Sequence, residues 1–387
     1  MTLDTTAMRD ALTDTIRRFA LAEIAPHVTA WDEAGEFPRA LYTQAAALGL
    51  LGLGYPEALG GTPATHALKV AMTVAIARYG ASGGVLASLF SHNIGLPPIL
   101  AHGSDTLQRE VIAPVLRGEQ IAALAITEPG GGSDVAALRT TARRDRDDYL
   151  IDGEKTFITS GMRADWLTVA VRTGEARGAS GISLIVVPGD SPGLSRTRLA
   201  KMGWLCSDTA TLHFDAVRVP ARYLLGDEGA GFRMIMGNFN GERLALAAGA
   251  LGFAQACLDE ALAWARERKT FGASLISHQA IRHKLADMQM RIASTQAWVD
   301  AVAAQGDALE AQGIVNAPEW VAAICLLENH ATQTMQFCAD ATVQILGGMG
   351  FMRGTVSERI YREVKVMMIG GGAEEIMKEL AAKQLGW

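Results

Sequence analysis

Cysteine is scarce in this chain, and its spacing excludes several classes of protein. The 387 residues include four cysteines, Cys206, Cys257, Cys325 and Cys338. None forms a Cys-x-x-Cys pair, so the sequence indicates neither a zinc site nor a disulfide framework. We therefore expect no bound metal, and we expect the protein to reside in a reducing compartment.

Long apolar runs and targeting signals are also lacking. No apolar stretch approaches the roughly 18 residues that suggest a membrane-spanning helix. The first residues, Met1-Thr2-Leu3-Asp4, show neither the basic and apolar pattern of a signal peptide nor an arginine-rich transit pattern. These absences predict a cytoplasmic protein that does not insert into membranes.

A surplus of positive charge is absent as well. The net charge is −6, the pI is near 5.8 and the basic residues are scattered, so we expect no nucleic-acid partner. The densest charged run, residues 143–148, nearly neutralises itself and is typical of a solvated hairpin tip. With 49% hydrophobic residues, the chain can bury a sizeable core, and its length suggests two to three domains of roughly 150 residues.

The hydrophobic pattern changes twice along the chain. From 1 to 121, apolar residues recur at three and four spacing, as at Ile16, Phe19, Ala20 and Ile24, which predicts a helical domain. From 122 to 233, short β-branched runs alternate with Gly, Pro and Asp turns and predict a small antiparallel β domain. From 234 to 387, Ala- and Leu-rich periodicity predicts a four-helix-bundle-like domain. The fold class is therefore α+β.

These patterns also locate individual elements. The expected strands include residues 149–151, 167–171, 182–187 and 210–214, and the expected bundle helices cover about 242–268, 278–305 and 318–346.

The most informative stretch is a glycine-rich turn, residues 126–134, followed by a second segment at 155–161. Three successive glycines after Pro129 leave the backbone free to take positive φ and to turn its N–H groups toward a phosphate, and Ser133 adds a hydroxyl donor. A dinucleotide pyrophosphate would fit such a turn. Taken alone, a Pro-Gly pair more often marks an ordinary surface turn.

The two segments together resemble the central domain of the acyl-CoA dehydrogenases, a family of FAD-dependent enzymes. They read Thr-Glu-Pro-Gly-x-Gly-Ser-Asp and aromatic-Ile-Thr-small-Gly. The order α, β, α is also that family's architecture, and the resemblance spans nearly the whole chain. It implies that the hydroxyls of Thr127 and Thr159 contact the isoalloxazine ring. The cofactor-binding residues that it implies in this region are Leu124, Ile126, Thr127, Gly132, Ser133, Phe157, Ile158 and Thr159.

Two further segments resemble contacts that the family makes to the FAD of a neighbouring subunit. The first contains Arg268, Thr270, Phe271, His278 and Gln279, and the second contains Gln344, Gly347 and Gly348. The resemblance implies that a monomer cannot complete its own site and that the protein is a homotetramer built as a pair of dimers. Taken singly, the segments also fit a basic helix end with a glycine cap and a plain glycine turn.

The resemblance also points to the catalytic base. The family removes a proton from the carbon next to a thioester carbonyl, and its largest branch uses a Glu in a loop before the last helix. Here Gly371 occupies that position. A smaller branch, resembling the long-chain and isovaleryl-CoA dehydrogenases, carries the Glu on the first helix of the C-terminal bundle, where this chain has Glu242. Burial in an apolar tunnel would raise the pKa of Glu242.

Glu242 also has a plainer interpretation. An acidic residue in the first turn of a helix, after an Asn that can cap it, is favoured by the helix dipole. Its neighbour Arg243 does not share a helix face with it, so we expect Arg243 to orient the loop or to contact the CoA chain. The residues implied at the substrate are Ser133, Asn240, Arg243, Gly371 and Gly372.

The loop before the last helix retains a role without its Glu side chain. The resemblance implies that the backbone N–H of Gly371 helps to stabilise the enolate oxygen, and that Ala373 and Glu375 lie at the cofactor. Ala373 departs from the family's usual Thr or Ser. Leu205 replaces a frequent basic or polar residue near the substrate entrance, which favours a hydrophobic acyl group. Cys206 is predicted to be a packing residue and not a nucleophile.

These observations predict an FAD-dependent acyl-CoA dehydrogenase that forms a trans-2-enoyl-CoA, in the setting of fatty acid metabolism and β-oxidation. By resemblance, the expected electron acceptor is electron-transferring flavoprotein. Alternatives are a flavin oxidase or monooxygenase of the same fold, and a dehydrogenase for acyl groups on a carrier protein. A catalytically silent flavoprotein would lack both bases, and the presence of Glu242 argues against it.

Overall fold

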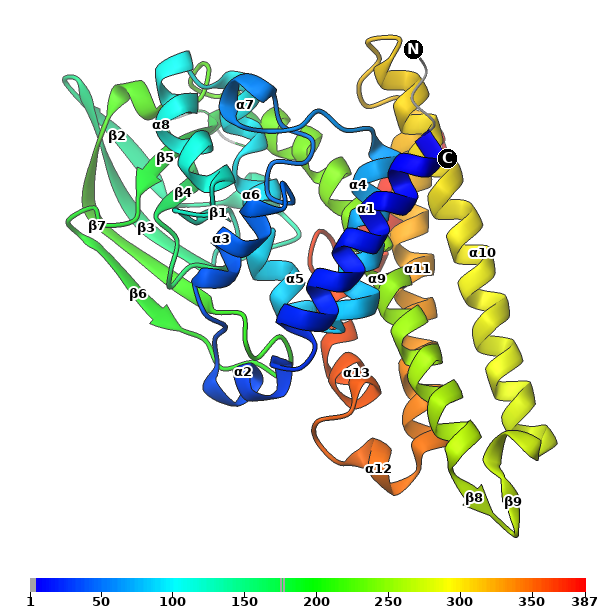
Figure 1. Ribbon diagram of the computed structural model, residues 1–387. Coiled ribbons are helices and arrows are strands. Elements are labelled where there is room, and N and C mark those ends of the chain that lie inside the picture. The colour runs from blue at the N-terminus through cyan, green and yellow to red at the C-terminus, as the bar shows by residue number, and fades with distance from the viewer. Residues whose placement is uncertain (1–4, 175, 177) are drawn as a thin grey trace.

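The computed structural model describes residues 5–174, 176 and 178–387 of the chain. Figure 1 shows three regions that follow one another in the sequence: a set of N-terminal helices, a curled sheet and a bundle of long helices. This order confirms the predicted α+β fold class.

The N-terminal region consists mostly of short helices. Its elements are α1 (Thr5–Phe19), the π-helical turn η1 (Ala20–Ile24), α2 (Val28–Ala34), α3 (Ala40–Ala47), α4 (His66–Gly80), α5 (Gly83–Leu89), α6 (His92–Gly95), α7 (Pro97–His102) and α8 (Asp105–Leu116). Ile16, Phe19, Ala20 and Ile24, whose spacing predicted a helix, are all buried. The apolar periodicity therefore identified the face of this region that packs inward.

The middle region is a seven-stranded sheet. Its strands are β1 (Ala122–Ala125), β2 (Thr141–Asp145), β3 (Asp148–Thr159), β4 (Trp166–Arg172), β5 (Ile182–Pro188), β6 (Leu194–Arg198) and β7 (Thr209–Pro220). They lie in the order β1-β4-β2-β3-β7-β6, with β5 also paired to β4. The four predicted strand segments fall within β3, β4, β5 and β7. The charged run lies at the tip of the β2–β3 hairpin, where Arg146 and Asp147 are exposed, as predicted.

The sheet departs from the prediction in one respect, because it is not antiparallel throughout. β1 runs parallel to β4, from Ala122 opposite Trp166 to Ala125 opposite Val169, and β2 makes one parallel pair with β4. A β-type pattern identifies a strand but not its direction, which depends on the connection between strands. Here the β2–β3 hairpin lies between β1 and β4 in the sequence and returns the chain to the end of the sheet where β1 began.

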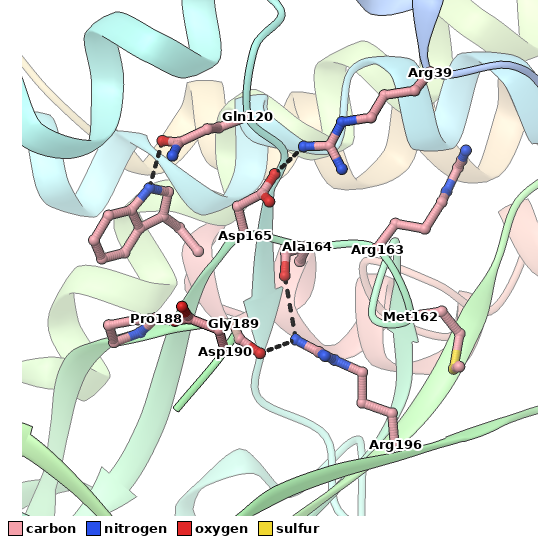
Figure 2. Close-up of a pocket in the computed structure, with 11 residues that line it drawn as sticks. Arg39, Gln120, Met162, Arg163, Ala164, Asp165, Pro188, Gly189, Asp190 and Arg196 are labelled. Atoms are coloured by element: carbon pink, nitrogen blue, oxygen red, sulfur yellow. Dashed lines mark hydrogen bonds and ion pairs between the residues drawn. The ribbon is translucent and has the colours of Figure 1, made fainter. Parts of the chain in front are cut away.

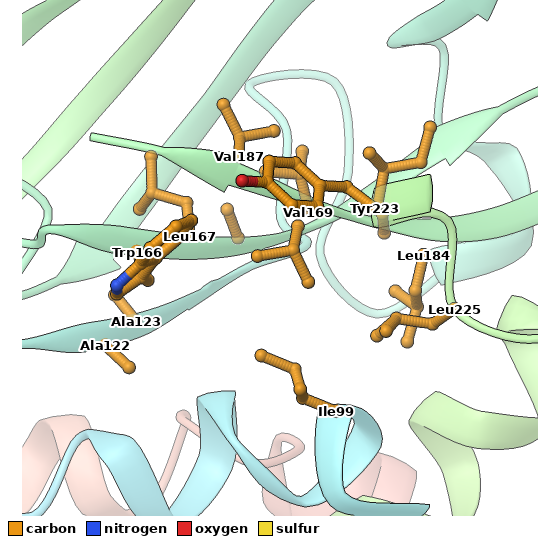
Figure 3. Close-up of a cluster of buried hydrophobic side chains, with 14 of the residues drawn as sticks. Ile99, Ala122, Ala123, Trp166, Leu167, Val169, Leu184, Val187, Tyr223 and Leu225 are labelled. Atoms are coloured by element: carbon orange, nitrogen blue, oxygen red, sulfur yellow. The ribbon is translucent and has the colours of Figure 1, made fainter. Parts of the chain in front are cut away.

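Helix α7 and strands β4 and β5 enclose the core of the middle region. Figure 3 shows Ile99 of α7 beneath the strands that carry Val169 and Leu184, and all three side chains are buried. Trp166 and Tyr223 meet edge to face, with ring centroids 6.0 Å apart. β4 and β5 are buried along nearly their whole length, which explains why they read as continuous apolar runs.

The C-terminal region is a bundle of long helices. Its elements are α9 (Gly231–Glu267), α10 (Gln279–Glu310), α11 (Pro318–Leu346), α12 (Gly348–Phe351), α13 (Val356–Met367) and α14 (Glu374–Gln384), and a small hairpin of β8 (Lys269–Thr270) and β9 (Ala273–Ser274) joins α9 to α10. α9 packs against both α11 and α4. Among the described residues it is the one helix long and apolar enough to cross a membrane, yet 72% of its apolar window is buried in the protein. It is a core helix.

α9 begins earlier than predicted. Its first residue is Gly231, whereas the hydrophobic pattern placed the start near residue 242. Gly231, Gly237 and Gly241 each disfavour a helix by about 1 kcal/mol relative to alanine, and packing against the rest of the protein overrides that local preference. Glu242 therefore lies well inside the helix, and the interpretation of Glu242 as a first-turn residue after a capping Asn240 is wrong.

Candidate active site

The two segments that predicted a flavin site lie side by side. The backbone N–H of Thr156 donates to the carbonyl of Thr127 at 2.8 Å, which joins β3 to the turn that follows β1. Thr127 and Thr159 are half-buried, and Ser133 is exposed on the turn. Ile126 is buried in the core of the sheet, so only its backbone is available to a ligand. The fold thus joins the two predicted segments and leaves all three hydroxyl-bearing residues at least partly accessible.

A bulge in β3 leaves an aromatic ring of the second segment exposed. The register between β3 and β7 shifts between Lys155 and Ile158, and Phe157 within the bulge has φ +60°. A left-handed conformation costs about 1–3 kcal/mol for a residue with a side chain. The ring of Phe157 is 69% exposed, although Thr156 and Ile158 beside it are buried. The strained backbone holds a large apolar ring in contact with solvent, as expected where a flat ligand covers it.

A buried ion pair, which the sequence analysis did not assign, anchors the turn to β3. Nζ of Lys155 donates to Oε1 of Glu128 at 2.8 Å and to the carbonyl of Ile126 at 3.0 Å. Glu128 also accepts from the backbone N–H groups of Arg139 and Thr140. Burial lowers the pKa of Lys155 to about 8. Burial alone would raise the pKa of Glu128, but the hydrogen bonds from Lys155 and Thr140 give a net lowering.

The glycines of the turn do not behave as predicted. None of Gly130, Gly131 and Gly132 adopts a positive φ, so the expected left-handed phosphate loop is wrong. Paired backbone hydrogen bonds between Glu128 and Gly131 close the turn instead. A Cβ built on Gly130 would meet no atom within 4 Å. The protein's own packing therefore does not demand glycine there, and the turn offers an open backbone surface.

Glu242 carries a carboxyl group that the protein leaves unpaired. Its Oε2 is shielded from solvent and has no hydrogen-bond partner. Burial raises the pKa of Glu242 to about 7, and the nearby charge of Arg243 opposes the rise. Arg243 does not bond to Glu242: its Nε donates to the carbonyl of Gly371 at 3.2 Å, and its Nη1 donates to Asn240 at 3.4 Å. Arg243 orients the loop, which was one of its two predicted roles.

The loop at Gly371 lies directly beside Glu242. Gly371 has φ +79° and Gly372 has φ +136°, conformations that favour glycine. A Cβ at position 371 would lie 2.8 Å from Leu246 Cδ1, 3.3 Å from Glu328 Oε1 and 4.0 Å from Glu242 Oε1. The structure thus brings together the two positions that the sequence analysis linked. A side chain at 371 would be strained by the positive φ and would require Leu246 and Glu328 to shift.

Glu328 of α11 is a further carboxyl in this group, and the sequence analysis missed it. Its side chain is 2% exposed, and neither carboxyl oxygen has a hydrogen-bond partner. Burial raises its pKa to about 9. The available signal was one acidic residue in an otherwise apolar stretch, Cys325-Leu326-Leu327-Glu328, since an unpaired charge is rarely buried.

Comparison with known proteins agrees with this geometry. Residues 6–119, 123–217 and 229–386 match the N-terminal, middle and C-terminal domains of the acyl-CoA dehydrogenases. The cyclohexane-1-carbonyl-CoA dehydrogenase of Geobacter metallireducens is 36% identical, over 97% of this chain and 96% of its own length. The chain belongs to the acyl-CoA dehydrogenase family.

Two more members of the family illustrate the likeness. The mitochondrial long-chain specific acyl-CoA dehydrogenase of Mus musculus is 35% identical over 97% of this chain and 86% of its own length. The crystal structure of a probable acyl-CoA dehydrogenase from Mycobacterium abscessus shares 46% identity and a TM-score of 0.93 over the full length of both chains.

Acyl-CoA dehydrogenases are FAD-dependent oxidoreductases, and the face around Phe157 fits that cofactor. An exposed aromatic ring suits an isoalloxazine face, and the hydroxyls of Thr127 and Thr159 can hydrogen-bond to its polar edge. The exposed backbone around Gly130 and the hydroxyl of Ser133 suit a phosphate. FAD is therefore the cofactor of this enzyme.

The other predicted cofactor residues lie elsewhere in the chain. The β8–β9 hairpin lies at the end of α9 and α10, away from the sheet (Figure 1). Phe271 at its tip is 99% exposed, and Oγ1 of Thr270 lies 3.1 Å from Nε2 of His278. α11 ends at Leu346, its C-cap Gly347 has φ +61°, and α12 follows at the same end of the bundle. These predicted contacts are not brought to the Phe157 face within one chain. The residues concerned are Arg268, Thr270, Phe271, His278, Gln279, Gln344, Gly347 and Gly348.

One hollow among the described residues lies away from these groups. It measures about 630 Å³, and Figure 2 shows Arg39 paired with Asp165 at its rim. The indole of Trp166, which also lines it, donates to Gln120 at 2.8 Å. Arg196 donates to backbone carbonyls of Ala164 and Gly189. None of its lining residues belongs to the predicted site. Its charged lining does not suit an acyl chain.

Cys206 is a packing residue, as predicted. It is fully buried, with its Sγ 3.6 Å from the hydroxyl of Ser82. Burial raises the pKa of its thiol far above the ordinary range. Since a neutral thiol is a poor nucleophile, Cys206 does not take part in the chemistry. The other three cysteines are also free and buried.

The last helix of the enzyme begins without a side-chain cap. Ala373 occupies the N-cap position of α14, with φ −60° and ψ +151°, and Glu374 and Glu375 fill the first turn. We expect Ala373→Ser to raise the free energy of unfolding by about 1 kcal/mol, because its hydroxyl can accept a free N–H of the first turn. Urea denaturation of the FAD-bound protein measures the change. Ala382→Ser, inside α14, is the matched control and should destabilise by about 0.5 kcal/mol. Equal effects of both substitutions would contradict the capping argument.

Proposed function

We propose that this acyl-CoA dehydrogenase oxidises a saturated acyl-CoA to the trans-2-enoyl-CoA with Glu242 as the base. The unpaired carboxyl of half-buried Glu242, whose Oε2 is shielded from solvent beside Gly371, carries the proposal. A carboxylate in such a setting has no partner to hold it, so it is free to accept a proton from a substrate. Its pKa of about 7 also brings its basicity close to the working pH, which suits a general base.

The proposed step removes two hydrogens from adjacent carbons. Glu242 takes the proton from the carbon next to the thioester carbonyl. FAD bound at the Phe157 face would accept the hydride, with its electron pair, from the next carbon, and the electron pair that the proton leaves behind becomes the second bond of the carbon–carbon double bond. The N–H of Gly371 is our candidate donor to the thioester oxygen as negative charge develops on it. Arg243 holds the carbonyl of the same residue and so anchors the loop next to that N–H.

We also propose a homotetramer in which each FAD is completed by a neighbouring subunit. The support is the exposure of large apolar side chains at the end of the bundle, Phe271 at 99% and Phe351 at 87%. Exposed aromatic residues of this size are typical of contact surfaces. The predicted cofactor residues of the hairpin also lie away from the Phe157 face of their own chain (Figure 1). Electron-transferring flavoprotein as acceptor and a role in β-oxidation complete the proposal by family resemblance, and a cytoplasmic location is proposed from the sequence pattern alone.

An anaerobic titration of the purified FAD-bound protein tests the proposed reaction. Acyl-CoAs of graded length and branching are added while the absorbance of oxidised flavin is followed. The names of the relatives suggest the first two substrates, cyclohexane-1-carbonyl-CoA and a long-chain acyl-CoA. We expect rapid bleaching by one class. No bleaching by any acyl-CoA would contradict the proposal and favour an acyl group on a carrier protein or a silent flavoprotein. Steady peroxide production in air would favour an oxidase or monooxygenase.

A further inference from the structure

The carboxyl of Glu328 has no partner in the protein, which makes its protonation state a structural question. Both of its oxygens are shielded from solvent and accept no hydrogen bond, and its side chain is among the most buried polar groups of the chain. An ionised carboxylate in such a place is strongly disfavoured, whereas a neutral carboxylic acid is tolerated. The surroundings therefore favour a bound proton on Glu328.

Glu328 and Glu242 border the same small space. One oxygen of each lies within 4.0 Å of the point where a Cβ at position 371 would stand, at 3.3 Å for Glu328 and 4.0 Å for Glu242. Glu328 reaches this space from α11, and Glu242 reaches it from α9. Two carboxyls from different helices thus converge at the loop that the proposed reaction uses.

Arg243 is the cation that faces this pair. Its charge lowers the pKa of both glutamates, and the charge of Glu242 raises the pKa of Glu328. The guanidinium itself bonds to the carbonyl of Gly371 and to Asn240, so it acts on the carboxyls through space. One cation balances one carboxylate. The pair can therefore ionise once at moderate pH but not twice without leaving a net negative charge in the interior.

Other charged groups around α11 are engaged elsewhere. On α10, Arg291 acts on His330 and Cys338, and on α13 Glu363 accepts from the backbone of Gly83. On α14, Glu374 is bonded to Lys378 and Gln333. The thiol of Cys325, on α11 itself, is kept neutral because burial raises its pKa to about 11. Residues 369–373 of the covering loop carry no ionisable side chain.

We propose that Glu328 is a positioning residue for the base, which keeps its own proton and thereby leaves Glu242 as the single carboxylate of the site. This inference rests on the proposed role of Glu242. Glu328 does not exchange its proton with the substrate: the proton removed from the substrate goes to Glu242 alone. When Glu328 does lose its proton, a second negative charge faces the carbon on which negative charge develops, and this charge slows proton removal.

The order of ionisation agrees with this assignment. Burial raises the pKa of Glu242 to about 7 and that of Glu328 to about 9. Between these values Glu242 is ionised and Glu328 is neutral. The rate of flavin reduction by the best acyl-CoA should therefore rise through the first value and fall through the second.

The pH profile of Glu328→Gln tests the proposal. Glutamine matches the shape of a protonated glutamate but cannot ionise. The variant should therefore keep the increase in reduction rate near pH 7 and lose the decrease near pH 9. One pH unit above the upper pKa, it should reduce its flavin about tenfold faster than the natural protein. Glu363→Gln, which removes another buried carboxyl, is the matched control. Its reduction rate should still increase near pH 7 and decrease near pH 9. A Glu328→Gln variant whose reduction rate still decreases near pH 9 would overturn the proposal.

Infrared spectroscopy tests the same proposal without turnover. At pH 8 the natural protein should show the C=O stretch of a buried, protonated carboxyl. This band should persist in Glu363→Gln, vanish in Glu328→Gln and titrate away near pH 9 in the natural protein. Absence of the band from the natural protein at pH 8 would overturn the inference even if the variant did not fold. If no acyl-CoA reduces the flavin but the band is present, the proposed function fails while the protonation of Glu328 stands.

Discussion

Glu242→Gln should reduce its flavin with acyl-CoA at least about a hundredfold more slowly than the natural protein, because a positioned general base contributes typically 10²–10⁴-fold. Glutamine preserves the size of the side chain and removes only its capacity to accept a proton. The carboxyl of Glu242 makes no hydrogen bond through its buried Oε2, so the substitution should break no structural contact there. Stopped-flow absorbance under anaerobic conditions measures the rate.

Two further observations make this experiment decisive. The variant should still bind FAD and should have the same assembly state as the natural protein, since glutamine keeps the size of the side chain and the carboxyl of Glu242 has no hydrogen-bond partner at its buried Oε2. Glu379→Gln, an exposed glutamate of α14, is the matched control and should leave the rate unchanged. A rate for Glu242→Gln close to that of the natural protein would show that another group removes the proton. Glu328 would then be the first candidate.

The pH dependence of the natural protein gives an independent check on Glu242. A base works only when it is ionised, and burial raises the pKa of this carboxyl to about 7. The rate should therefore fall about tenfold for each pH unit below that value, whereas an ordinary exposed glutamate would stay active to about pH 4.3. If Glu242→Gln no longer shows this decrease in rate below pH 7, the group that titrates is Glu242. A rate that stays constant down to pH 5 would contradict the buried setting.

Lys155→Met should lower the free energy of unfolding by about 3–5 kcal/mol, because it removes the cation from a buried ion pair and leaves the carboxylate unpaired. The side chain of Lys155 is fully buried and makes two hydrogen bonds, to Glu128 and to the carbonyl of Ile126. Methionine fills similar space without a charge. Since Glu128 anchors the turn that faces the cofactor, the variant should also bind FAD more weakly. Chemical denaturation and FAD titration measure the two effects.

Two companion variants separate the lost charge from the lost packing. Lys378→Met removes an exposed partner of Glu374 one helical turn away and should cost no more than about 0.5 kcal/mol. Adding Glu128→Gln to Lys155→Met removes the stranded charge and should recover part of the lost stability. If Lys155→Met and Lys378→Met had equal effects, the buried pair would not be a structural anchor.

The sequence predicted several strands from local pattern, since the β-branched runs identified β3, β4, β5 and β7. The candidate base, Glu242, and its link to Gly371 came from the family resemblance, and the two positions lie close together in the structure. The start of α9 was misplaced because three glycines within it have low helix propensity, and only packing shows that the helix continues through them. The parallel direction of β1 depends on the connections between strands and not on its four residues.

The side-chain partnerships of the site were the hardest features to predict. Lys155 and Glu128 are 27 residues apart, and nothing in either neighbourhood indicates the other. Glu328 reaches the site from a helix that begins well beyond Glu242 in the sequence, so its proximity depends on how α11 packs against α9. The turn at Gly130 shows the reverse case, in which a local pattern suggested positive φ angles that the backbone does not adopt.

The unbroken course of α9 limits how this chain can change over evolutionary time. Its 37 residues span about 55 Å at 1.5 Å per residue, with Glu242 in the first half and the β8–β9 hairpin at the far end. Insertion of one residue into α9 between Glu242 and the hairpin would rotate the hairpin about the helix axis by about 100° relative to Glu242. Loops elsewhere can lengthen or shorten without this penalty. Within α9, divergence is confined to substitution, and the spacing from base to hairpin is kept by the geometry of the helix itself.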